Sequence, residues 1–175
     1  MPRSQQPPDG EKIITRKILL GPHYWVLDVG CGDGKWSEYF FKKVSQLHGV
    51  EICKDYIDKY NLITKYDEIY HCDICDFKRF FLFDVVILGD VLEHLEHDRA
   101  IELIDTLKNY ILTVFLTIPI SKCVQDGKVY GNPYETHRYQ WTHEELIILG
   151  FKQLHEDYNE NGLVKIGTYE MICGT

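Results

Sequence analysis

The sequence predicts an α/β protein built as a three-layer sandwich, with helices on both faces of a central sheet. Short apolar segments alternate with segments of helical period through most of the chain, which is the pattern of strand–helix units. The runs 83–88 and 111–118 are continuous and rich in valine and isoleucine, as in parallel strands buried on both faces. The end of the chain carries an Asn161-Gly162 turn between two apolar segments, which predicts an antiparallel hairpin.

The first half of the chain contains the alternation in its clearest form. A leading helix is expected over 11–20, because its isoleucines lie on one face. Aromatic residues at helical spacing predict a second helix over 35–47, and a third is expected over 55–61. The strands of this half are predicted at 24–29, 50–53 and 68–72.

The second half is predicted from stripes, caps and turns. Apolar residues at i, i+3, i+4 and i+7 predict a helix across 100–107. Thr142 and Glu145 form a capping box, and Gly150 stops the helix that follows. The hairpin strands are expected at 151–155 and 163–173. The connection over 119–140 has no periodicity, and connections of that length are usually functional or mobile.

Length and composition predict one globular domain over residues 1–175, with 1–10 as a flexible tail. The chain is 45% hydrophobic and 26% charged, which excludes disorder as a class. Its net charge of −8 disfavours a nucleic-acid partner, because duplex binding needs a concentrated basic face. No apolar run is long enough for a membrane span or a signal core, so we expect a cytoplasmic protein with reduced cysteines.

The most informative motif is the glycine-rich turn Val26-Leu-Asp-Val-Gly-Cys-Gly-Asp-Gly34. Glycines at alternate positions after an apolar strand allow a tight turn and close approach of a ligand. The ligand would lie at the carboxyl ends of the strands. A dinucleotide site needs its third glycine one residue later. The carboxylates of Asp28 and Asp33 favour a cationic ligand over a pyrophosphate.

This turn resembles motif I of the class I S-adenosylmethionine-dependent methyltransferases, and the order of elements over about 20–175 follows that family. The resemblance implies a Rossmann-like sheet of seven strands, mostly parallel, with the last hairpin antiparallel. It implies an enzyme that uses S-adenosyl-L-methionine. Residue by residue, it implies that the cofactor-binding positions are Asp28, Gly30, Cys31, Gly32, Glu51, Ile52, Asp73, Ile74, Gly89 and Val91. Among these, Glu51 would hold the ribose hydroxyls and Asp73 the adenine amino group.

Two histidines are the candidate catalytic residues. His94 follows the fourth strand in Asp90-Val-Leu-Glu93-His94 and could act as a general base; it could equally cap or pack the next helix. His137 lies in the long connection, which could fold over the site as a lid or be pinned against the sheet. We expect the acceptor to be a hydroxyl or amine of a small molecule or sugar. The short chain also leaves room for a partner protein or a homodimer.

Two alternatives stay open. The pattern of Asp90, Glu93, His94 and His137 also resembles the metal-dependent methyltransferases that modify the terminal 2′-hydroxyl of small RNAs. In those enzymes such residues hold a divalent cation. The Asp-Val-Leu-Glu-His segment is common in metal-free methyltransferases, so our primary prediction includes no metal ligand. The other alternative is a catalytically silent subunit that only binds the cofactor.

Overall fold

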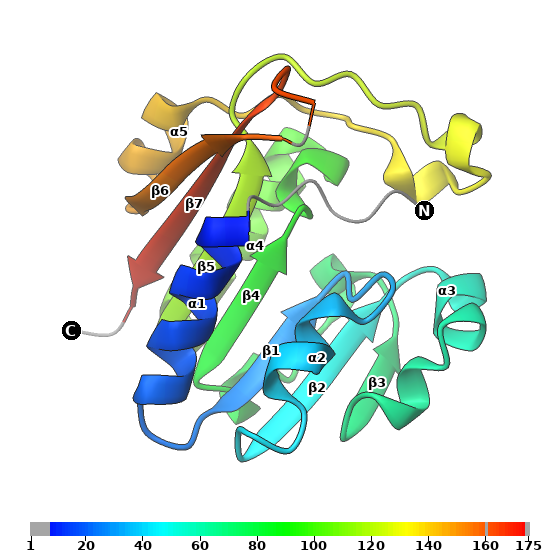
Figure 1. Cartoon of the computed structure of the whole chain (residues 1–175), viewed down its shortest axis with the longest axis vertical. Coiled ribbons are helices and arrows are strands. Elements are labelled where there is room, and N and C mark those ends of the chain that lie inside the picture. The colour runs from blue at the N-terminus through cyan, green and yellow to red at the C-terminus, as the bar shows by residue number, and fades with distance from the viewer. Residues whose placement is uncertain (1–7, 160, 174–175) are drawn as a thin grey trace.

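A single seven-stranded sheet organises the chain, as the computed structural model shows for residues 8–159 and 161–173 (Figure 1). The strands are β1 (Trp25–Val29), β2 (Gln46–Glu51), β3 (Glu68–His71), β4 (Val85–Gly89), β5 (Thr113–Pro119), β6 (Lys152–Tyr158) and β7 (Lys165–Ile172). Their order is β3-β2-β1-β4-β5-β7-β6. Strands β1 to β5 are parallel, and β7 is antiparallel to both β5 and β6. The predicted fold class, including the antiparallel hairpin, is therefore confirmed.

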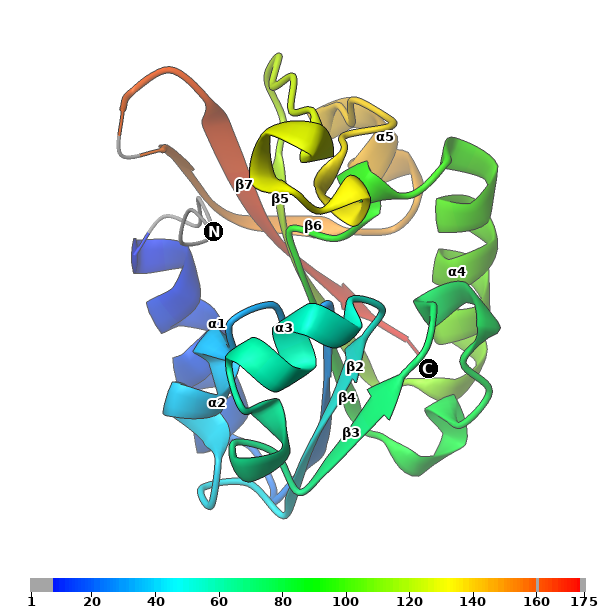
Figure 2. The same cartoon turned by 90° about the vertical axis from the view of Figure 1, so that its right-hand side faces the viewer.

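Helices cover both faces of this sheet (Figure 2). They are α1 (Pro8–Leu20), α2 (Lys35–Phe40), α3 (Lys54–Lys59), α4 (His97–Tyr110) and α5 (His143–Ile148). Successive strand residues point to opposite faces. In β1, Val26 packs in the core beneath α1 and α2, whereas Leu27 packs in the core beneath α4 and α5. Both side chains are fully buried, which explains why the strands read as continuous apolar runs.

The sequence predictions for the second helix, the second strand and the N-terminal tail differ from the structure in their bounds. The helix predicted over 35–47 ends at Phe40, and the chain turns through Lys42, whose φ of 61° belongs to the left-handed region. Leu47, assigned to that helix, instead pairs with Val26 in the sheet, and β2 begins at Gln46 rather than at residue 50. Of the tail expected over 1–10, residues 1–7 lie outside the described residues, and 8–10 form the first turn of α1.

The start of α5 agrees with the prediction. Thr142 and Glu145 form the reciprocal capping box, and the side chains of Trp141 and Leu146 on either side of it are fully buried. The long connection before it contains two 3₁₀ turns, η5 (Gly127–Tyr130) and η6 (Pro133–Glu135). None of the described helices is long and apolar enough to span a membrane.

The topology predicts a crevice at the carboxyl ends of the central strands β1 and β4. From β1 the chain crosses to β2 and β3 on one side and then returns to β4 and β5 on the other. Chain order thus reverses between β1 and β4, and their two carboxyl ends diverge into connections on opposite faces. Ligands of open α/β sheets bind outside the strand ends at this kind of position.

Candidate functional site

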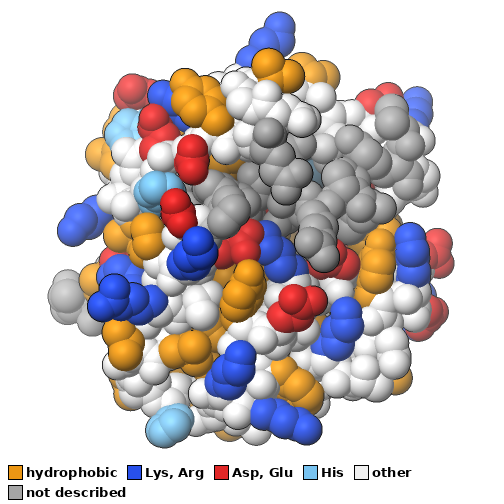
Figure 3. Space-filling model, viewed as in Figure 1, with side chains coloured by type: hydrophobic (Ala, Val, Ile, Leu, Met, Phe, Trp, Pro, Cys, Tyr) orange, Lys and Arg blue, Asp and Glu red, His pale blue; other side chains and the backbone are white. Residues whose placement is uncertain are grey.

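A cavity of about 480 Å³ opens at this reversal point. Its walls come from the ends of the parallel strands β1 to β5, from the 3₁₀ turn η4 (Leu92–His94) and from η6. That volume suits one small-molecule ligand or two that share a site. On the face of the molecule in Figure 3, basic and acidic side chains are interspersed, and the described part of that face carries no patch of one sign.

The glycine-rich turn forms the floor of the cavity. Gly30, Gly32 and Gly34 all have positive φ, of 64°, 55° and 83°. A Cβ at Gly30 would lie 3.0 Å from a methyl carbon of Val91, so any larger residue would crowd the far wall. Between these glycines, the Cys31 thiol turns inward and contacts the carbonyl of Val50 at 3.3 Å. The sequence thus folds the turn so that peptide groups at Gly30 and Gly32 line the cavity.

Glu51 is held rigidly at the tip of β2. Its Oε2 accepts from the Gly32 amide at 2.9 Å, and its Oε1 accepts from the Cys53 amide at 2.8 Å. The side chain is only 5% exposed, and burial raises its pKa above the ordinary value for glutamate. Each carboxylate oxygen has a second lone pair, so this group can accept further bonds from hydroxyl groups in the cavity.

Asp73 and Ile74 form the next part of the wall, at the end of β3. The Asp73 carboxylate caps the 3₁₀ turn η2 (Ile74–Asp76), where Oδ1 accepts from the Cys75 amide at 2.9 Å. Its Oδ2 accepts from Arg99 Nη1 at 3.0 Å. Ile74 is buried beside it and presents an apolar surface to the cavity.

Asp28 is the one predicted cofactor residue that the structure places elsewhere. It does not line the cavity; it lies under the turn, and its Oδ2 accepts from the Tyr66 hydroxyl at 2.5 Å. Burial, opposed by that hydrogen bond, raises its pKa to about 7. The side chain thus supports the turn from beneath, and a role for Asp28 in cofactor binding stays a prediction.

Asp90 and Glu93 form the opposite wall, at the end of β4. Asp90 has a φ of 55°, a conformation that glycine, asparagine and aspartate adopt more readily than other residues, and its amide donates to the Thr117 carbonyl at 3.0 Å. Both carboxylate oxygens of Asp90 and Oε2 of Glu93 are buried, and no described residue hydrogen-bonds to them. Burial raises the pKa of both carboxyls.

His94 and His137 face each other beside these carboxyls, with ring centroids 4.9 Å apart. The His94 Nδ1 lies 3.2 Å from the Thr136 carbonyl, and the His137 Nδ1 lies 2.8 Å from the Cys123 carbonyl. Carbonyls only accept, so both Nδ1 atoms donate and both Nε2 atoms keep a lone pair. Burial and the neighbouring ring lower the pKa of His94 to about 4, and burial lowers that of His137.

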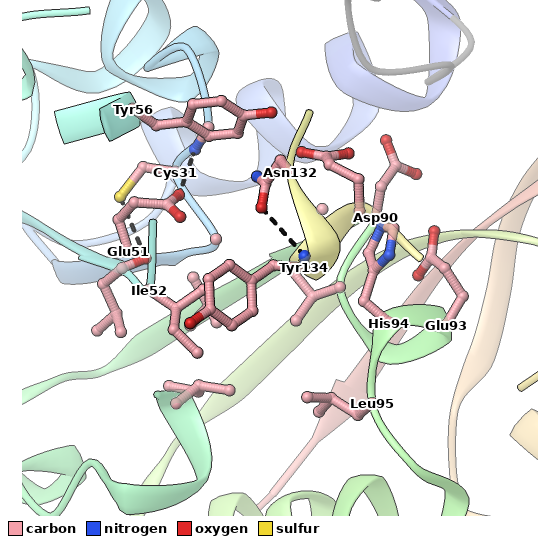
Figure 4. A pocket seen from close by; sticks show the side chains of 18 of the residues that line it. Cys31, Glu51, Ile52, Tyr56, Asp90, Glu93, His94, Leu95, Asn132 and Tyr134 are labelled. Carbon is pink, nitrogen blue, oxygen red and sulfur yellow. Dashed lines mark hydrogen bonds between the residues drawn. The ribbon is translucent and has the colours of Figure 1, made fainter. Parts of the chain in front are cut away.

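The connection over 119–140 crosses the top of the cavity and reaches α3. Asn132 caps η6 by accepting from the Tyr134 amide at 3.0 Å (Figure 4). The Tyr56 hydroxyl faces Asn132 and Glu135, and burial raises the pKa of Tyr56 to about 12. The base of the connection is fixed where the Arg138 amide donates to the Glu93 carbonyl at 2.8 Å. It therefore forms a roof over the cavity.

The structure brings the other predicted site residues together around one cavity. Those lining it are Gly30, Cys31, Gly32, Glu51, Ile52, Asp73, Ile74, Gly89, Val91, His94 and His137. Sequence reasoning missed the roles of Tyr56, Asn132 and Glu135 in the roof. The Gly131-Asn132-Pro133 triplet could have indicated a fixed turn there, whereas nothing in the sequence pairs Tyr56 with it.

Two groups of side chains among the described residues have ligand atoms close enough to hold a metal ion. Glu93, His94 and His137 have theirs within 4.8 Å of one another inside the cavity. The other group is Asp9, His155 and Asp157 at the surface between α1 and β6. Only the first group belongs to the site described here, and Asp90 is not a member of it.

Comparisons with known proteins agree with this geometry. A family model described as a methyltransferase domain matches residues 27–107. No curated protein matches the chain in sequence. Among solved structures, 1,6-didemethyltoxoflavin-N1-methyltransferase from Burkholderia thailandensis, with bound 1,6-didemethyltoxoflavin and S-adenosylhomocysteine, is similar with a TM-score of 0.72. It is 14% identical over 96% of this chain and 78% of that one.

Two further solved structures of similar fold are methyltransferases with other named substrates. Magnesium protoporphyrin IX methyltransferase from Synechocystis PCC 6803, with bound S-adenosylhomocysteine, has a TM-score of 0.63 and 17% identity over 95% of this chain and 84% of that one. The small RNA methyltransferase HEN1 has a TM-score of 0.70 and 16% identity over 94% of this chain, which spans 25% of that protein. At these identities the structures establish the fold, and their named substrates differ widely.

Proposed function

Because this chain belongs to the class I S-adenosylmethionine-dependent methyltransferases, we propose that it methylates a hydroxyl or amine of a small molecule or sugar. The proposal rests on one observation, which is that two opposite walls of the cavity differ in chemistry. One wall has a carboxylate fixed by two backbone amides at Glu51, and the other has buried carboxyl and imidazole groups that point at the same space. The cofactor supplies a methyl group on a positively charged sulfur.

The residues of the first wall fit the cofactor. The turn at Gly30 leaves a cradle that a Cβ would fill. Glu51 offers free lone pairs for the ribose hydroxyls, and Ile52 and Ile74 offer apolar contact for the base. Asp73 keeps only its second lone pairs for an adenine amino group, because Cys75 and Arg99 already donate to its oxygens.

His94 and His137 are proposed to orient the acceptor. A histidine with a pKa near 4 stays neutral at physiological pH and is a weak base, so it accepts a hydrogen bond more readily than it removes a proton from a hydroxyl. The free Nε2 lone pairs would hold the acceptor's O–H or N–H group. Orientation of the nucleophile for in-line attack on the methyl carbon is a large part of what such a site can contribute.

Two measurements test this proposal. Isothermal titration with S-adenosylmethionine and S-adenosylhomocysteine is expected to give saturable heat, and either ligand should raise the melting temperature. Incubation with methyl-labelled cofactor and a panel of small amines, alcohols and sugars, followed by mass spectrometry, should then yield a labelled product. If neither ligand binds, the cofactor assignment is wrong.

The Glu93, His94 and His137 cluster favours one further candidate, a metal-dependent transfer to a hydroxylated acceptor. Both histidines donate Nδ1–H to backbone carbonyls, the second contact typical of metal-bound imidazole. A divalent cation held there would grip the acceptor's hydroxyls, as the small RNA methyltransferase alternative requires. This candidate predicts that Mg²⁺ or Mn²⁺ raises turnover and that His137→Ala removes the metal dependence. Unchanged turnover in a chelator would eliminate it.

A further inference from the structure

We propose that Asp90 is the specificity-determining residue of the acceptor site and that the acceptor is an amine which enters as its ammonium ion. This inference rests on the proposed function and deepens it. It begins with the two carboxylate oxygens of Asp90, which are buried against the cavity without a hydrogen bond from any described residue. A buried carboxyl left without a partner is costly, and such groups in native proteins usually await a ligand or ion.

The cations that line the cavity are ion-paired with other carboxylates, and among them Lys35 also acts on Asp90, since its charge lowers the pKa of that carboxyl. There are three such residues, each ion-paired with a different carboxylate: Lys35 with Glu11, Arg99 with Asp73 and Arg138 with Glu96. Asp90 and Glu93 therefore remain as negative or proton-holding groups on one wall. A ligand that carries a positive charge and several N–H donors matches this wall, whereas a phosphate or a carboxylate would be repelled.

The backbone at Asp90 also indicates a functional position. A residue at φ 55° is uncommon unless it is glycine, asparagine or aspartate. Figure 4 shows Asp90 together with Glu93 and His94 on one side of the cavity, across from Glu51 and Tyr56. The acceptor would thus lie between Asp90 and the cofactor wall, near the imidazole lone pairs.

The bound ammonium must become a neutral amine before methyl transfer. An ammonium nitrogen has no lone pair, so the bound acceptor would have to release one proton to solvent before it reacts. Its nitrogen would then form a bond to the methyl carbon while the carbon–sulfur bond breaks and sulfur keeps the electron pair, and the product would leave as the methylated ammonium. A hydroxyl is neutral and gains no ion pair with Asp90.

The test uses three probes that share one framework and differ in one end group: phenethylamine, 2-phenylethanol and phenylacetate. Their binding to the full chain is measured by ligand-observed NMR in the presence of saturating S-adenosylhomocysteine and a chelator. Wild-type protein should bind the amine at least about tenfold more tightly than the alcohol or the acid, the size of one desolvated charge contact. Asp90→Asn should abolish that preference, and Asp90→Glu should restore part of it.

Asn suits this position because it tolerates the left-handed conformation, so Asp90→Asn should fold. The matched control is Asp98→Asn, which removes a fully exposed carboxylate outside the cavity and should keep the preference. Equal binding of the three probes, no binding of the amine, or an unchanged preference in Asp90→Asn would each overturn the inference while S-adenosylhomocysteine still binds. Loss of S-adenosylhomocysteine binding by the wild type would instead remove the proposed function on which it rests.

Discussion

The two walls of the cavity differ in how completely the protein satisfies its own polar groups. At the tips of β2 and β3, both oxygens of Glu51 and of Asp73 accept hydrogen bonds from amides or from Arg99. At the tip of β4, neither oxygen of Asp90 has a described partner, and one oxygen of Glu93 has none. The first wall is preorganised, whereas the second is left for a ligand to complete.

This difference suits a protein that binds a shared cofactor and a particular acceptor. A preorganised wall loses little entropy on binding, so it favours affinity. Unsatisfied buried groups destabilise the free protein, and only a ligand with matching donors recovers that free energy. The second wall therefore favours specificity. Four predictions test this contrast, from the largest expected effect to the smallest.

The largest effect is expected at Trp141, which packs behind the second wall. Its ring is fully buried and lies 5.1 Å from Tyr139 and 5.3 Å from His97 between centroids. Trp141→Ala should lower the free energy of unfolding by about 3–5 kcal/mol, measured by urea denaturation, because it leaves a large cavity. Trp141→Phe should cost much less, since the Trp141 Nε1 has no described partner to lose. Equal losses would mean that packing does not hold this wall.

The second prediction compares how a substitution in each wall changes the affinity for S-adenosylhomocysteine. Glu51→Ala should weaken S-adenosylhomocysteine by about 1–3 kcal/mol, about fivefold to 150-fold, because the Gly32 and Cys53 amides lose their acceptor and the proposed ribose contact is lost. Asp90→Asn, on the other wall, should leave this affinity within about twofold. Calorimetry measures both values. If Asp90→Asn weakened S-adenosylhomocysteine more than Glu51→Ala does, the cofactor would bind to the wall that contains Asp90.

How much of the structure can be predicted from the sequence depends on how far apart the interacting residues lie along the chain. The parallel strands were predictable because each is a local apolar run, and the capping box at Thr142 and Glu145 spans only four residues. The end of α2 was missed because the aromatic spacing continues past Phe40, and only Lys42, in the left-handed region, breaks the helix.

Contacts between distant segments escaped prediction for the same reason. Asp28 bonds to Tyr66, and the Tyr56 hydroxyl faces Asn132, yet nothing in the local pattern links either pair. The family resemblance located most of the cavity wall, because motifs mark positions on strand ends. It did not indicate which carboxyls the protein satisfies internally, and that property distinguishes Asp28 from Glu51 and both from Asp90.

The third prediction concerns the pH dependence of stability that the buried Asp90 carboxyl causes. Burial raises the folded pKa of Asp90 above its unfolded value, so the stability associated with its neutral form is present at low pH and is lost as pH rises through the folded pKa. Asn carries no charge at any pH. The unfolding free energy of Asp90→Asn should therefore rise relative to wild type as the pH increases from about 4 to about 7, the interval between the unfolded and the folded pKa of Asp90.

Thermal and urea unfolding at several pH values measure this difference. Asp98→Asn serves as the control, and its difference from wild type should stay flat over the same range, because that carboxylate is fully exposed. A pH-independent difference for Asp90→Asn would mean that the carboxyl is already matched by a charge in the free protein. The second wall would then be as complete as the first.

The smallest effect is expected where the roof is fixed by an exposed ion pair. Arg138 Nη1 lies 3.0 Å from Glu96 Oε1, and both side chains are about half exposed to solvent. Glu96→Gln should change the unfolding free energy by less than about 1 kcal/mol, because solvent screens exposed pairs. The base of the roof is instead held by the Arg138 amide, which bonds to the Glu93 carbonyl whatever side chain stands at 96. A larger loss in urea denaturation would show that surface charge, rather than this backbone contact, keeps the roof against the second wall.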